Sequence, residues 1–171
     1  MSLQLTSGRH SLQLLFISSV YAVCWLIFKG YIFNTADQGE SLSLVYKALD
    51  NSLYSKDFYI SSCEGVFTIR YFYVHFLAFL GQWIPMSYLC FGLEFICLTA
   101  SIAAYLKIAQ WLSPRISDFY STVPFWMLFF FYGWTVGGNS LQYSLLISST
   151  FAKALAPWGL YFALKRNWVL S

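Results

Sequence analysis

The stretch LQLLFISSVYAVCWLIFKGYIF, from Leu12 to Phe33, decides the fold class. A helix needs roughly 20 mostly apolar residues to cross the hydrocarbon core of a bilayer, and this stretch supplies them with Lys29 as its single charge. It is too long for a removable signal peptide and has no clear small-residue cleavage site. We therefore predict a permanent membrane helix.

The composition of the whole chain agrees with a lipid environment. Of its 171 residues, 58% are hydrophobic and only 10% are charged, whereas about 25% are charged in a typical soluble domain. So few charged side chains cannot cover a soluble surface of this size. The net charge of +3 is scattered, so a nucleic-acid partner is not predicted. The four cysteines show no CxxC spacing, so neither a zinc site nor a disulfide framework is predicted.

Further apolar stretches predict more membrane helices. The proline at position 85 predicts a tight turn between the second and third helices, which should form a hairpin. The prediction is an all-α fold: a polytopic transmembrane helical bundle of about five membrane helices, in one membrane domain over residues 1–171. The five predicted spans are about 12–33, 65–84, 87–112, 119–134 and 141–164.

One long polar segment, residues 34–64, separates the first two predicted spans and holds five of the seven acidic residues. Apolar side chains recur at helical spacing inside it, with polar residues on the opposite side. This pattern predicts an amphipathic helix that lies along the membrane surface. The apolar positions are Leu42, Val45, Tyr46, Leu49 and Leu53.

Asp37 and Glu40, directly after the first span, allow two interpretations. In the structural one, Asp37 is a helix N-cap and Glu40 is its capping-box partner. In the functional one, a carboxylate at the membrane surface acts as a general base or holds a divalent metal ion against a phosphate leaving group. The two interpretations are compatible with each other.

The order of membrane anchor, acidic loop, surface helix and aromatic-rich bundle resembles the start of polytopic glycosyltransferases of the GT-C fold. The resemblance covers most of the chain, with Asp37 and Glu40 in the place of the family's acidic motif. It implies a polyprenyl-phosphate-linked sugar donor, catalytic roles for Asp37 and Glu40, and a bacterial inner (plasma) membrane. A divalent metal ion is a candidate cofactor under the functional interpretation of these carboxylates. Members of the family are longer, so the resemblance implies a fragment or reduced relative that is inactive by itself.

Three further residues are candidates for substrate binding. Asp57 stands where a second acid can sit in the family, although a solvated turn residue is the simpler interpretation. Arg70 is a candidate for contact with lipid or substrate phosphates. His75 is either a hydrogen-bonded packing residue or a ligand.

Glu94 and Lys153 are charges inside predicted spans, and we predict that they pair with each other. Such a pair either locks two helices together or has a role in transport or substrate binding. The rival function is therefore a small transporter or structural membrane protein, with membrane lipids as its partners.

The membrane orientation stays open at this point. The count of lysines and arginines places the acid-rich loop in the cytoplasm. The GT-C resemblance implies that this loop is extracytoplasmic, and we favour that side.

Overall fold

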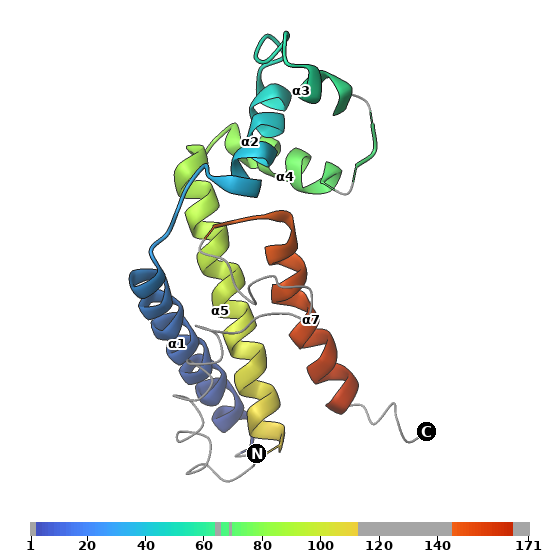
Figure 1. The fold of residues 1–171 in the computed structure, drawn as a ribbon. Helices are drawn as coiled ribbons and strands as arrows, with labels where there is room; N and C mark the ends of the chain where they lie inside the picture. Colours follow the sequence, from blue (N-terminus) through green and yellow to red (C-terminus); the bar gives the residue numbers. More distant parts are fainter. Residues whose placement is uncertain (1–2, 64–65, 69, 113–144, 166–171) are drawn as a thin grey trace. The chain divides into compact units, whose positions relative to one another are not determined.

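The computed structural model describes residues 3–63, 66–68, 70–112 and 145–165 (Figure 1). All regular secondary structure in these residues is helical, which confirms the all-α prediction. The helices are α1 (Leu3–Lys29), α2 (Ala36–Leu49), α3 (Phe58–Cys63), α4 (Tyr71–Gly81), α5 (Met86–Leu112) and α7 (Ser148–Lys165).

Two of these helices are long and apolar enough to cross a membrane, by length and composition. They are the Ser11–Lys29 part of α1 and the whole of α5, and they correspond to the first and third predicted spans. On α1, large apolar side chains remain exposed, including Phe16 at 70% and Phe28 at 77%. A helix in water would lose stability from such exposure, whereas lipid would cover it.

The remaining predicted spans have different outcomes. In the 65–84 stretch, α4 has only 11 residues, a length of about 16 Å against about 30 Å of hydrocarbon. The 119–134 stretch lies outside the described residues, and so does the start of the 141–164 stretch. Within the 141–164 stretch, α7 begins at Ser148 and contains Pro157. This helix is not one of the two candidate spans. The count of five membrane helices therefore stays a prediction.

The chain divides into two compact units. The first contains the described residues of 3–30, 95–112 and 149–165. Within it, the indole Nε1 of Trp158 on α7 donates a hydrogen bond to the carbonyl oxygen of Ala100 on α5, at 2.9 Å. The Ser101 hydroxyl on α5 also donates to the carbonyl oxygen of Lys153, at 3.4 Å. These side chains join α5 to α7.

The second unit contains the described residues of 31–94 and 145–148, and it carries the candidate site. In it, α2 packs against α4 and contacts α3 (Figure 1). Leu42 and Val45 on α2, together with Leu77 on α4, are fully buried. The hydroxyl of Tyr73 on α4 donates to the carbonyl oxygen of Leu146 at 3.0 Å, which ties α4 to the 145–148 segment.

The predicted surface helix is present as α2. Its apolar face packs against α4, whereas we expected this face to lie on the membrane surface. Leu42 and Val45 are buried inside the second unit, so they do not face a membrane surface. The helix also ends at Leu49, whereas the predicted apolar periodicity continues to Leu53, which lies in a turn and is 42% exposed. Burial against α4 satisfies the apolar face, because a packed protein neighbour removes it from water as effectively as lipid.

Candidate functional site

The start of α2 does not form the capping box predicted for Asp37 and Glu40. The N-cap residue is Thr35, without a side-chain cap, and Asp37 lies in the first turn. The Gln38 side chain takes the place of the predicted box, because its Oε1 accepts a hydrogen bond from the backbone N–H of Asn34 at 2.7 Å.

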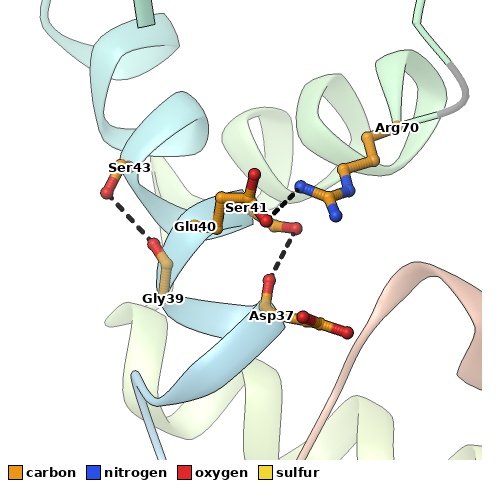
Figure 2. Close-up of polar contacts among 6 residues, drawn as sticks. All are labelled: Asp37, Gly39, Glu40, Ser41, Ser43 and Arg70. Carbon is orange, nitrogen blue, oxygen red and sulfur yellow. Dashed lines mark hydrogen bonds and ion pairs between the residues drawn. The ribbon is translucent and has the colours of Figure 1, made fainter. Parts of the chain in front are cut away.

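Glu40 forms the centre of a polar cluster that joins three helices. Its Oε2 lies 2.8 Å from Nη1 of Arg70, the N-cap residue of α4 (Figure 2). The Tyr59 hydroxyl on α3 donates a hydrogen bond to the same carboxylate. The side chains of Arg70 and Glu40 are 26% and 41% exposed, so water screens the pair in part. We call Glu40, Tyr59 and Arg70 the Glu40 cluster.

The contacts within the Glu40 cluster shift the pKa values of all three side chains. The hydrogen bond from Tyr59, followed by that from Arg70, lowers the pKa of Glu40 below its usual range. The same bond to Glu40 raises the pKa of Tyr59 to about 12. The Glu40 carboxylate also raises the pKa of Arg70. At neutral pH, therefore, Glu40 is ionised, and its carboxylate is engaged by two donors.

Asp37 has different surroundings from Glu40. It is exposed in the first turn of α2, and its carboxylate lies apart from the Glu40–Arg70 pair in Figure 2. Within the described part of the chain, no hydrogen bond or ion pair engages that carboxylate. Its charge still acts on Arg70, whose pKa it helps to raise. Asp37 and Glu40 thus have different surroundings, and the catalytic roles predicted for both stay predictions.

A cavity of about 290 Å³ lies in the same unit, between α2, α3 and α4. Lys47 Nζ on its wall donates a hydrogen bond to the Asn51 carbonyl oxygen at 2.7 Å. His75 stacks on Tyr71 with the ring centroids 4.1 Å apart, and its Nδ1 lies 2.9 Å from the Tyr71 carbonyl oxygen. His75 therefore packs locally while it lines the cavity. Apolar lining residues are Leu44, Ala48, Ile60, Val66 and Val74.

Other predicted site residues have local structural roles or lie elsewhere. Asp57 caps α3, because its Oδ1 accepts a hydrogen bond from the Ile60 backbone N–H at 3.0 Å. Glu94 is fully buried on α5, in the second unit, whereas Lys153 is on α7 in the first unit. Their pairing stays a prediction.

A divalent metal ion was a candidate cofactor from the resemblance. No group of three or more His, Cys, Asp or Glu side chains suited to a metal ion gathers in the described ranges. Glu40, the nearest acid to Asp37 along α2, is already held by the Arg70 cation. Among the described residues, the acids near Asp37 therefore do not supply the set of oxygen ligands that a divalent metal ion needs.

Comparison of the chain with family models, with curated proteins and with solved structures finds no match. The site is consequently interpreted from its geometry. Sequence reasoning missed Tyr59, although it falls in the aromatic stretch beside Asp57. No local pattern marks this residue, because its partner Glu40 is reached only through the packing of α3 beside α2.

Proposed function

We propose that this chain is a membrane module of a GT-C-like glycosyltransferase that takes a sugar from a polyprenyl-phosphate donor. The observation that carries the proposal is the exposed Asp37 carboxylate, which lies in the first turn of α2 within electrostatic reach of Arg70. A base and a cation in one site are the groups that sugar transfer from a phosphate requires.

The position of this pair along the chain also supports a lipid-linked donor. Only residues 30–35 separate the candidate span of α1 from α2. The glycosyl–phosphate bond of such a donor lies at the level of the lipid headgroups. A carboxylate that follows a membrane helix so closely is therefore near the reacting bond.

In the proposed reaction, the acceptor hydroxyl attacks the anomeric carbon of the donor sugar while Asp37 takes its proton. The bond between the anomeric carbon and the phosphate oxygen breaks, and the phosphate leaves with the bonding electron pair. Arg70 stabilises the charge on the departing phosphate. Glu40 and Tyr59 hold the Arg70 side chain in place, because both bind within one cluster on three helices.

The first test is the side of the membrane on which this site lies. We would replace Cys24, Cys90 and Cys97 and label the remaining Cys63, the last residue of α3, with an impermeant thiol reagent. The donor reaction requires an extracytoplasmic site in a bacterial inner membrane, so Cys63 should react in intact cells. Labelling only after lysis would place α3 in the cytoplasm and overturn the proposal.

The second test measures transfer of radiolabelled sugar from a polyprenyl-phosphate donor in membranes of the cells that make the protein, which retain whatever further protein a chain inactive by itself needs. General-base catalysis contributes about 10²–10⁴-fold, so Asp37→Asn should lower the rate by that factor while it leaves donor binding intact. Asp50→Asn is the matched control, since it also removes one carboxylate, from an exposed residue at the end of α2. Transfer by Asp37→Asn at the wild-type rate would rule out Asp37 as the base.

A second candidate function is transport or structural support within the membrane. It is favoured by Glu94, which is fully buried on a helix able to cross a membrane. Buried intramembrane carboxylates commonly mark ion or substrate paths, or pairs that fix a bundle. If Glu94→Gln, and not Asp37→Asn, abolishes the measured activity or destabilises the protein, this second candidate is the better interpretation.

A further inference from the structure

One face of α4 carries a row of exposed aromatic side chains: Phe72, Phe76, Phe79 and, in the turn that continues the helix, Trp83. The backbone N–H of Trp83 still bonds to the Leu80 carbonyl oxygen, at 3.1 Å. Spacings of four, three and four residues place all four side chains within about 60° of one another around the helix. We call this row the aromatic stripe.

The stripe lies on the face of α4 opposite the buried one. The opposite face of α4 supplies the buried residues Tyr73, Val74, Leu77 and Ala78. The stripe residues, in contrast, are exposed by 72% at Phe72, 44% at Phe76, 58% at Phe79 and 64% at Trp83. The sequence of α4 also contains no Asp, Glu, Lys or Arg. A continuous uncharged aromatic surface of this kind indicates a partner that covers it.

The edge of the stripe is polar along one side. His75 and Gln82 are exposed, and helical geometry places both on the same flank, about 60–80° from Phe72. Tyr71, also exposed, lies further along that flank. A helix with an aromatic face and a polar flank is typical of helices that lie in the plane of a membrane interface. Trp and Tyr are enriched at that depth because their rings have an apolar body and a polar group.

The place of α4 in the chain selects the bilayer as its partner. Residues 82–85 alone separate α4 from α5, a helix able to cross a membrane. The two helices also meet, because a Cβ added at Gly81 would lie 2.7 Å from Cε of Met86. With its 11 residues, α4 is too short to span the bilayer itself. A short aromatic helix held at the end of a spanning helix is at the depth of the lipid headgroups.

We propose that the aromatic stripe is a membrane-insertion surface, on which α4 lies in the bilayer interface with its aromatic rings among the upper parts of the acyl chains. The opposite face of α4 carries α2, so the stripe fixes the height of the second unit above the hydrocarbon. The proposal requires α5 to cross the membrane, but it does not depend on sugar transfer.

The test is a depth measurement on the full chain in phosphatidylcholine vesicles. A nitroxide is attached at Phe76→Cys, or at Lys56→Cys in the exposed turn before α3, after replacement of the four native cysteines. Insertion places the label at position 76 about 5–10 Å below the headgroup boundary. Its relaxation should respond more to oxygen than to a water-soluble nickel chelate, whereas the label at position 56 should respond more to nickel.

Two results would overturn the proposal. Equal nickel access at positions 76 and 56 would place the stripe in water. Shielding of position 76 from both reagents would mean that protein covers it, either a second copy or another part of this chain.

A second experiment keeps the four native cysteines and changes the aromatic stripe only at Trp83. Emission of the wild type minus that of Trp83→Phe isolates the fluorescence of Trp83. Lipids brominated near the headgroup end of the acyl chain should quench this difference more strongly than lipids brominated near the chain terminus. Trp25→Phe, which removes a buried tryptophan on α1, is the matched control, and its difference emission should be quenched less. Absence of quenching at Trp83 would overturn the proposal without any cysteine replacement.

Discussion

Arg70 Nη1 and Glu40 Oε2 lie 2.8 Å apart, so one ion pair joins the beginning of α4 to the beginning of α2. The Tyr59 hydroxyl, bound to the same carboxylate, adds α3 to this connection. Both ends of the ion pair are partly exposed. The contact therefore fixes geometry more than it adds stability.

The first prediction concerns the strength of this pair. A double-mutant cycle with Glu40→Ala and Arg70→Ala should give a coupling free energy of about 0.5–1 kcal/mol, because partly exposed ion pairs contribute little. Thermal unfolding of the four proteins in detergent micelles measures it. The pair Lys56→Ala and Arg70→Ala is the control, since Lys56 is exposed in a turn and no coupling is expected. Equal coupling in both cycles would contradict the assigned contact.

The second prediction is a pH dependence. The folded-state pKa of Glu40 is lowered from an ordinary value of 4.5. Its contribution to stability is therefore present above that value and is lost as the pH falls through the folded-state pKa. The difference in melting temperature between wild type and Glu40→Gln should be constant near neutral pH and shrink below pH 4.5. A difference that stays constant down to acid unfolding would mean that Glu40 carries no lowered pKa.

The third prediction separates the two interpretations of Asp57. As the cap of α3, Asp57 accepts the Ile60 N–H bond, and its replacement by alanine should cost about 1 kcal/mol. Amide exchange at Ile60 should then accelerate, and Cys63 at the end of α3 should react faster with thiol reagents. Asp57→Asn, which retains an acceptor oxygen, should restore most of the protection. Loss of sugar transfer by Asp57→Asn with α3 intact would instead favour the substrate role.

The fourth prediction tests the face on which α2 is buried. Leu42 is fully buried, whereas Leu53 is 42% exposed in a turn. Leu42→Ala should destabilise the protein by about 2–5 kcal/mol, because it removes buried surface and leaves a cavity. Leu53→Ala removes the same atoms and should cost less than about 0.5 kcal/mol. Equal losses in the free energy of unfolding for the two variants would contradict the packing of α2 on α4.

The long helices could be predicted from the sequence because a single property marks them. Continuous apolar composition over the necessary length identifies both candidate spans, at α1 and α5. The same property misleads over residues 65–84, where apolar residues continue but the helix begins only at Tyr71. Composition indicates which residues avoid water, but it does not distinguish burial in lipid from burial against α2.

The candidate site was harder to predict than the long helices, because it depends on contacts between helices. Asp37 and Glu40 could be selected because they are close in sequence and follow a membrane helix. Their separate roles depend on Arg70 and Tyr59, which reach Glu40 only after α2, α3 and α4 have packed together. The spacing of residues along one helix predicts contacts between residues three or four positions apart. It does not predict contacts with residues on other helices, such as Arg70 and Tyr59.

The hydrogen bond from Tyr73 to Leu146 has a consequence for the order of events during synthesis. The second unit draws its residues from 31–94 and then from 145–148, so its two parts leave the ribosome at different times. Until Leu146 has been made, the Tyr73 hydroxyl lacks the backbone acceptor that it has in the finished unit. Folding of this unit therefore cannot be completed as its first part emerges, and must wait for a segment that is added after the whole of α5.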